Sequence, residues 1–182
     1  MSELNQLLLD FNYKQNFNDH DYYVSKSNFF AFNLIDKWPK WEKKIVNLCG
    51  EKFSGKTHLA NIFKSKNKSL ILSEKEINNE VFKKAKLFDS IIIDDFSNII
   101  SEEIFYSIFN FVDQDNKYLL INSEIPINEM NFRLPDLVSR SKNVLIAKIE
   151  NPDDDLIFAI IIKNFSDRQI KLEKKIVEYI IN

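Results

Sequence analysis

The most informative shortage in this 182-residue chain is glycine. An average chain of this length would contain about a dozen glycines, at ~7%, whereas this one contains two, Gly50 and Gly55. Glycine tolerates positive φ and close backbone approach at little steric cost. We therefore expect each of the two to stand where the backbone requires that freedom.

Arginine and cysteine are also scarce. Only Arg133, Arg140 and Arg168 are arginines, so lysine is the general surface cation of this chain. Each arginine is therefore a candidate for bidentate or planar recognition, which lysine performs poorly. The one cysteine, Cys49, excludes an internal disulfide and argues against a Cys-based zinc site.

Other shortages disfavour whole classes of protein. The chain has no apolar run near the ~20 residues that a membrane-spanning helix needs, and no charged-then-apolar leader opens it. We therefore expect a soluble, cytoplasmic protein with no membrane partner. The net charge of −2 disfavours a strongly basic module, so no direct sequence-specific DNA binding is expected. A hydrophobic content of 45% still allows a sizeable core.

Short apolar runs alternate with helical patterns through the middle of the chain. This alternation predicts an α/β fold with a parallel sheet of five strands and helices on both faces. A first helix, capped by Ser27 or Asn28, is expected to run to residue 37. The strands are expected at residues 45–49, 69–73, 90–94, 118–122 and 144–149, and the later helices at 55–64, 76–86, 102–111 and 135–141.

The two ends of the chain differ from this middle part. The first 20 residues are polar and irregular, and this pattern predicts a mobile arm. The exception is one apolar stretch, Gln6-Leu7-Leu8-Leu9-Asp10-Phe11, which we call the apolar knot. After Pro152 the pattern predicts only helices, one from residue 153 to about 165 and one over 173–181. The expected parts are an arm at 1–20, a nucleotide-binding α/β domain at 21–150 and a small helical annex at 151–182.

Both glycines fall on the fixed positions of G-x-x-x-x-G-K-[ST], the phosphate-binding loop. An expected strand precedes the motif and an expected helix follows it, so a chance match is the weaker interpretation. Backbone N–H groups and the helix dipole would hold phosphate oxygens. Lys56 would reach the β- and γ-phosphates, and the Thr57 hydroxyl would bind Mg²⁺. The loop is Gly50-Glu51-Lys52-Phe53-Ser54-Gly55-Lys56-Thr57.

Polar groups follow two of the other expected strands. Asp94 is the candidate Mg²⁺ ligand, and Asp95 the candidate group that orients or deprotonates an attacking water. A helix cap made by the two acids is the alternative. Asn122 is the first choice and Ser123 the second for positioning that water, with an ordinary turn as the alternative. Arg140, at the end of a short expected helix, is a candidate to reach a nucleotide held by a neighbouring protomer.

Over residues 5–181 the chain resembles the DnaA-related branch of AAA+ ATPases. The resemblance implies an AAA+ fold with a helical lid, ADP or ATP with Mg²⁺ as cofactors, and Arg140 as an arginine finger. It also implies an adenine pocket at Tyr23, Val24 and Asn28, and a nucleotide site that extends to His58. The matching pieces are Tyr23-Val24, Ser27-Asn28-x-x-Ala31, Ile35-Asp36-x-Trp38-Pro39-x-Trp41, Gly55-Lys56-Thr57-His58-Leu59-Ala60, Asp94-Asp95, Leu134-Pro135-Asp136-Leu137-x-Ser139-Arg140 and Asn151-Pro152-Asp153.

Within that branch the chain is similar to the Hda-like regulators, which inactivate the initiator DnaA. The apolar knot resembles the QLxLxF peptide that docks on the replicative sliding clamp. Gln6 would offer its amide to a polar rim, while Leu7, Leu9 and Phe11 would anchor in an apolar cleft; a core strand is the alternative. Since little sequence follows the annex, we expect no counterpart here of the DNA-binding domain that DnaA carries.

The resemblance implies a clamp-tethered regulator that promotes hydrolysis of ATP on DnaA. The lid of the family has a third helix with a sensor arginine, which has no match here, so hydrolysis by this chain itself stays open. A helicase loader with the same core is one alternative function. Whether the chain forms a homo-oligomer is left open by the sequence. A small P-loop kinase is another alternative, and the lack of an arginine cluster argues against it.

Overall fold

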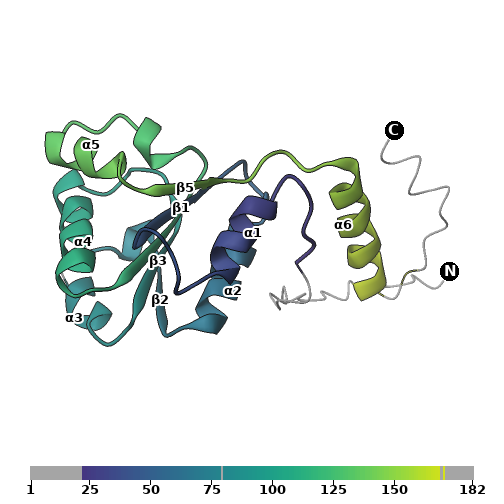
Figure 1. Ribbon diagram of the computed structural model, residues 1–182, viewed down its shortest axis with the longest axis horizontal. Coiled ribbons are helices and arrows are strands. Elements are labelled where there is room, and N and C mark those ends of the chain that lie inside the picture. The colour runs from purple at the N-terminus through teal and green to yellow at the C-terminus, as the bar shows by residue number, and fades with distance from the viewer. Residues whose placement is uncertain (1–21, 79, 169, 171–182) are drawn as a thin grey trace, which may run out of the picture.

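The computed structural model describes residues 22–78, 80–168 and 170. A parallel sheet of five strands forms the centre of the protein (Figure 1). The strand order is β2-β3-β4-β1-β5, so β1 lies between the two strands that come last in the chain. This confirms the predicted fold class. The strands are β1 (Ile45–Cys49), β2 (Ser69–Ser73), β3 (Ser90–Phe96), β4 (Tyr118–Ser123) and β5 (Leu145–Lys148).

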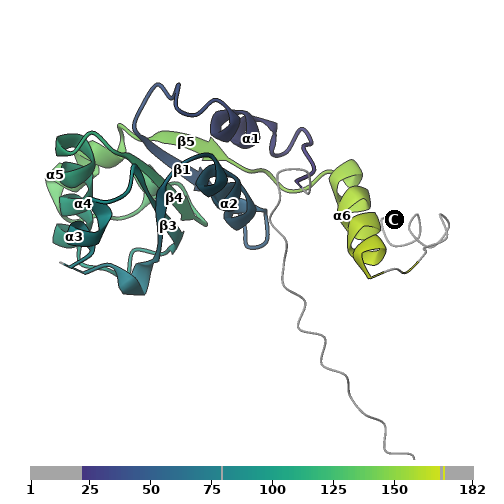
Figure 2. The same cartoon turned by 90° about the horizontal axis from the view of Figure 1, so that it is seen from below.

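Helices cover both faces of the sheet, as Figure 2 shows. The central strands are almost continuously apolar because each of their faces is buried, as expected for a parallel sheet. One face packs on α1 (Phe29–Asp36) and α2 (Lys56–Lys66), around the buried ring of Phe63. The other packs on α3 (Val81–Ala85), α4 (Glu102–Gln114) and α5 (Pro135–Ser141), around Phe105 and Phe109.

Within the described residues, the helix expected over residues 76–86 does not form as one element. The segment instead forms a 3₁₀ turn, Glu74–Glu76, and the short α3. Local side-chain bonds explain the difference, because the Ser73 N–H and hydroxyl both donate to the Glu76 carboxylate, each at 2.7 Å. Side-chain bonds of this kind offer the backbone an alternative to helix.

The helix after Pro152 is confirmed as α6 (Asp154–Asp167). Asp153 caps it by accepting a hydrogen bond from the Leu156 N–H at 2.9 Å, and acids in its first turn suit the helix dipole. Leu156 is its one buried residue, and the helix stands apart from the sheet (Figure 1). The helix expected over 173–181 lies outside the described residues. No helix in the described part of the chain could cross a membrane.

Candidate functional site

The candidate site lies where three neighbouring strands end, which we call the carboxyl edge of the sheet. Strands β3, β4 and β1 are adjacent and parallel, so the segments that follow them meet at one edge. Leu48 pairs with Asn122, and Ile93 pairs with Ile121. This register brings the residues after Ile93, the end of β4 and the phosphate loop together.

Both glycines of the loop stand where another residue would not fit. A Cβ on Gly50 would lie 2.7 Å from the carbonyl oxygen of Ile149, closer than real Cβ contacts allow. Gly55 has a φ of +95°, and a Cβ there would lie 3.2 Å from the ring of Tyr22. The expectation that the glycines are needed for their backbone freedom is therefore confirmed.

The side chain of Lys56 folds back over the loop. Its Nζ donates to the carbonyl oxygens of Gly50 and Glu51, each at 2.7 Å, and lies 3.4 Å from the Ser54 hydroxyl. Burial lowers the pKa of this lysine below its ordinary value, against the opposing pull of carboxylates that include Glu124. The ammonium group is held by neutral acceptors, so an anion that entered the loop would be a stronger partner.

Asp94 is the meeting point of the site. The Thr57 hydroxyl donates to its Oδ1 at 3.3 Å, and the Asn122 amide donates to the same oxygen at 2.8 Å. Ser123 turns elsewhere, because its hydroxyl donates to the Ile125 carbonyl at 2.6 Å and accepts from the Asn47 amide at 2.8 Å. Of the two side chains considered for positioning water, Asn122 is thus the one beside Asp94.

Two residues of the site adopt positive φ without being glycine. Asp95 has a φ of 57° and lies at an irregularity in the pairing of β3 with β4. Phe53, at the middle of the phosphate loop, has a φ of 64° and a fully exposed side chain. The left-handed region costs a residue with a Cβ roughly 1–2 kcal/mol, and such strain often collects at functional sites.

The residues present fit a nucleotide with a divalent cation. Helix α2 begins at the end of the loop without a side-chain cap, and this leaves its first N–H groups for a ligand. The Asn122 Oδ1 is buried with no hydrogen-bond partner among the described residues. Together with the Asp94 carboxylate and the Thr57 hydroxyl it offers oxygen donors, which Mg²⁺ and its water ligands prefer.

The residues expected to line an adenine pocket lie in the segment before α1. Asn28 is buried and holds this segment: its Oδ1 accepts from the Ser25 N–H and its Nδ2 donates to the Tyr23 carbonyl, both at 2.9 Å. Tyr23 and Val24 line a cavity of about 520 Å³ that reaches the start of α6 at Asp153–155. The position of this cavity suits a group bound between the sheet domain and the annex.

Sequence reasoning missed Tyr22, which contacts the phosphate loop and the start of α2 more closely than Tyr23 does. Tyr22 packs against Gly55 and meets the His58 ring edge-on at 5.1 Å, whereas half of the Tyr23 side chain is exposed. Burial raises the pKa of the Tyr22 hydroxyl well above its ordinary range. Nothing in the adjacent pair of tyrosines distinguishes them before the fold is known.

Two other charged side chains of the loop, those of Glu51 and Lys52, are exposed. Lys52 forms an exposed ion pair with Glu124, at 3.4 Å, so the loop is joined to the segment after β4. The Glu51 side chain is exposed, and its backbone carbonyl accepts from Lys56 and from the Ser54 N–H. The part of Glu51 that contacts Lys56 is therefore its backbone carbonyl.

Arg140 lies at the opposite edge of the sheet, where the strands begin, which we call the amino edge. Its Nη1 donates to Asp113 on α4 at 2.6 Å, and its guanidinium lies 5.3 Å from the centre of the Tyr106 ring. The five-residue β1 separates the two edges by about 15 Å. Arg140 is thus directed away from the phosphate loop of its own chain. The clamp-like residues Gln6, Leu7, Leu9 and Phe11 lie outside the described residues.

Comparison with known proteins points to replication initiators. No protein-family model matches the chain. The chromosomal replication initiator protein DnaA of Helicobacter hepaticus is 28% identical over 185 residues, covering 88% of this chain and 40% of the relative. DnaA of Nostoc punctiforme is 33% identical over 97 residues, covering 50% of this chain and 21% of the relative. The chain thus spans less than half the length of these relatives.

Solved structures of replication proteins are also similar to this chain. Domain III of Thermotoga maritima DnaA superposes with a TM-score of 0.75 at 19% identity, covering 91% of this chain and 80% of that one. A replication initiator DnaA bound to AMPPCP and single-stranded DNA gives 0.72 at 19%, covering 89% and 58%. A DnaI structure gives 0.51 at 18%, covering 68% and 79%.

At these identities the likeness shows the fold. This chain has the α/β architecture of AAA+ domain III of DnaA. The initiator that was solved with single-stranded DNA lends no support to the expectation that this chain avoids DNA, which stays a prediction.

Proposed function

We propose that this chain is an adenine-nucleotide-binding AAA+ regulator of replication initiation that acts on DnaA in the manner of Hda. The observation that carries the proposal is the division between the two edges of the sheet. Lys56, Asp94 and Asn122 converge at the carboxyl edge, whereas Arg140 lies at the amino edge. A protein built this way can hold one nucleotide and offer an arginine to another.

The carboxyl edge would hold ADP or ATP. Lys56 would exchange its two carbonyl acceptors for phosphate oxygens, and the first N–H groups of α2 would bind the same phosphates. Thr57 and Asp94 would hold Mg²⁺, which supplies charge neutralisation of the phosphates when bound. Asn122 and Asp95 would orient a water.

The amino edge would act on the partner. Arg140 would leave Asp113 and extend toward the γ-phosphate of ATP bound to DnaA. An arginine supplied from another protein is worth roughly 10³–10⁵ in rate, because it stabilises charge that develops in the transition state. Hydrolysis on DnaA would then convert the initiator to its inactive form.

We further propose that residues 6–11 tether the protein to the sliding clamp on newly replicated DNA, which places it in the cytoplasm at the nucleoid. Burial of Leu7, Leu9 and Phe11 at about 1.5–3 kcal/mol each, less the cost of ordering the segment, is consistent with micromolar binding. A Leu9→Ala, Phe11→Ala double variant should abolish clamp binding and leave the melting temperature nearly unchanged. A large fall in melting temperature would assign these residues to the core instead.

The test of the whole proposal is hydrolysis of ATP on DnaA in the presence of DNA-loaded clamp. The wild-type chain should stimulate it, and Arg140→Ala should lose at least 10³-fold of that stimulation. Arg140→Lys should restore little, since an ammonium lacks the planar fork. Arg133→Ala is the matched control, because Arg133 is an exposed arginine in the segment that precedes α5. An Arg140→Ala variant as active as wild type would refute the finger.

A helicase loader is the second candidate, favoured by the resemblance to DnaI. The two functions differ in their partner. Fluorescence anisotropy with labelled DnaA and labelled replicative helicase separates them, because the regulator should bind DnaA and the loader should bind helicase. Tight binding to helicase without binding to DnaA would select the loader.

A further inference from the structure

Asn47 is a polar residue in the middle of the apolar strand β1, and it is fully buried. A carboxamide removed from water costs free energy unless its polar atoms are hydrogen-bonded. The three shortest hydrogen bonds of Asn47 all reach the end of β4 and the turn after it. Its Nδ2 donates to the Ile121 carbonyl at 2.9 Å and to the Ser123 hydroxyl at 2.8 Å. Its Oδ1 accepts from the Ile127 N–H at 3.0 Å.

The residue that these bonds surround is Asn122. It lies between Ile121 and Ser123 in β4, and successive side chains of a strand point to opposite faces of the sheet. Asn47 and Ser123 therefore lie on the face that packs on α4 and α5, whereas Asn122 lies on the α2 face, where its amide donates to Asp94. Asn47 can thus act on Asn122 only through the backbone that flanks it.

Ser123 extends the hold of Asn47 on this turn. Its hydroxyl, which accepts from Asn47, donates in turn to the Ile125 carbonyl at 2.6 Å. Its backbone carbonyl accepts from the N–H of Gly50, the first residue of the phosphate loop, at 3.3 Å. The turn after β4 is therefore joined to β1 at several points, and an apolar residue at position 47 would make none of the side-chain bonds.

We propose that Asn47 is the positioning residue that holds Asn122 beside Asp94, so that the Asn122 carboxamide is presented to a bound Mg²⁺ and its water ligands. This role deepens the proposed function and rests on it, since it concerns the same nucleotide site. Asn47 is not a catalytic residue, because its own hydrogen bonds go to protein groups. The alternative is a solely structural asparagine, which would stabilise the fold without affecting the site.

The first measurement needs no nucleotide. The side-chain amide of Asn122 gives a pair of signals in a ¹⁵N–¹H NMR spectrum, and their loss in Asn122→Ala assigns them. In Asn47→Leu, which is close in volume and makes no side-chain hydrogen bond, these signals should move or broaden, because the amide loses its fixed place at Asp94. The matched control is Ser90→Ala, which should leave them unchanged. Ser90 is fully buried in the same sheet and hydrogen-bonded to Ser69, but at the amino edge.

The second measurement is the Mg²⁺ dependence of ADP binding, expressed as the ratio of the Kd without Mg²⁺ to the Kd with it. Asn47→Leu should lower this ratio about fivefold, which is the contribution of one net hydrogen bond, and Asn122→Ala should do the same. The double variant should lose no more than either single variant, since effects of residues that act together are not additive. Ser90→Ala should keep the wild-type ratio even though its melting temperature falls.

Ser123→Ala provides a second variant in case Asn47→Leu does not fold. It cuts the link from Asn47 to the Ile125 carbonyl and leaves the other bonds of Asn47 in place. It should shift the same Asn122 signals by less and lower the Mg²⁺ ratio roughly twofold.

Two results would overturn the proposal. Unchanged Asn122 signals in a folded Asn47→Leu would show that Asn122 keeps its place without Asn47. An unchanged Mg²⁺ ratio with a lower melting temperature would make Asn47 solely structural. A wild-type chain that binds no ADP would instead refute the proposed function, and the Asn122 signals alone would then decide whether Asn47 positions Asn122.

Discussion

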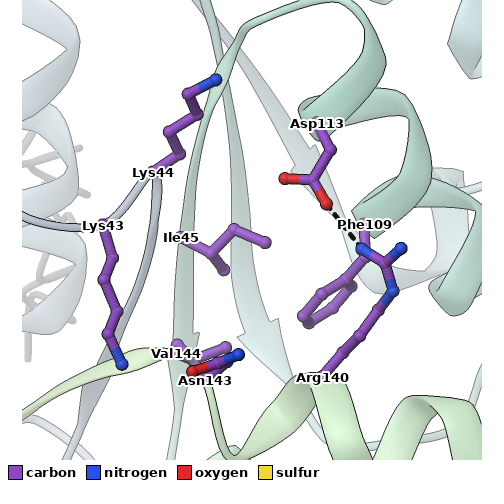
Figure 3. A pocket seen from close by; sticks show the side chains of 8 residues that line it. All are labelled: Lys43, Lys44, Ile45, Phe109, Asp113, Arg140, Asn143 and Val144. Carbon is purple, nitrogen blue, oxygen red and sulfur yellow. Dashed lines mark hydrogen bonds and ion pairs between the residues drawn. The ribbon is translucent and has the colours of Figure 1, made fainter.

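The two edges of the sheet are formed by different kinds of chemical group. At the carboxyl edge, the candidate site depends on backbone geometry and short buried side chains: two glycines where a Cβ would clash or be strained, and an Asn122 that is fully buried. At the amino edge, Arg140 is a long side chain at the surface, and its ion pair with Asp113 is partly exposed (Figure 3).

The difference indicates what each edge can do. A site fixed by backbone is suited to a ligand of constant shape, such as a nucleotide, and changes there should alter ligand affinity and stability together. Long charged side chains keep rotamer freedom that is lost only on binding, and changes there should alter recognition of a partner and leave the fold intact. The following predictions test that division.

The largest effect is expected for Lys56→Ala, which should abolish adenine-nucleotide binding. Nucleotide at ~100 times its Kd should stabilise the wild type by about 2.7 kcal/mol, and the variant should gain nothing. Melting curves with and without Mg²⁺ and ADP measure this. Lys52→Ala, in the same loop but paired with Glu124, should keep the shift, and so should Arg140→Ala. An undiminished shift in Lys56→Ala would break the comparison.

The reactivity of the Cys49 thiol reports how far the carboxyl edge is closed to solvent, because Cys49 ends β1 directly before the loop. Burial, reinforced by the charge of Glu129, raises its pKa to about 11. Near pH 8 the thiolate fraction should therefore be about two orders of magnitude below that of a free cysteine, whose pKa is ~8.5. Labelling with a chromogenic disulfide should be correspondingly slow and should rise about tenfold per pH unit up to pH 10. Denatured protein is the control, and equal rates in the two states would contradict a closed edge.

A smaller effect is expected for Gly55→Ala. The new Cβ would face the Tyr22 ring at 3.2 Å, and alanine resists a φ of +95°. We expect a loss of roughly 1–2 kcal/mol in the free energy of unfolding, together with weaker nucleotide binding. Denaturant unfolding measures the first and titration the second. A change in nucleotide affinity with unchanged stability would show that the loop is not fixed by its backbone.

The smallest effect is expected for Phe53→Gly, the opposite change in the same loop. The side chain of Phe53 is fully exposed, so its removal loses little burial, while a φ of 64° suits glycine. Relief of strain should slightly exceed the added entropy of the unfolded chain, for a gain of up to about 1 kcal/mol. Phe53→Ala retains the strain and should be close to neutral. A clear loss of stability in Phe53→Gly would reveal a packing role for this side chain.

The sequence was informative where the signal is local. Apolar runs located all five strands, and the loop motif located both glycines. The choice between Asn122 and Ser123 depended on strand register, since neighbouring residues of a strand point to opposite sides. The pairs of Tyr22 with Gly55 and of Arg140 with Asp113 depend on how distant elements pack, and no spacing in the sequence indicates them.

The order of the strands has a consequence for how the protein folds during its synthesis on the ribosome. The strand that leads into the phosphate loop, β1, is bordered by β4 and β5, with Val46 paired to Leu120 on one side and Leu145 on the other. Both neighbours are synthesised long after β1, by on the order of 10 s at ordinary rates of translation. During that interval β1 is an apolar segment without its partners. A nascent chain arrested before β5 should therefore expose it to chaperones, and nucleotide could assist folding only after Lys148 has emerged.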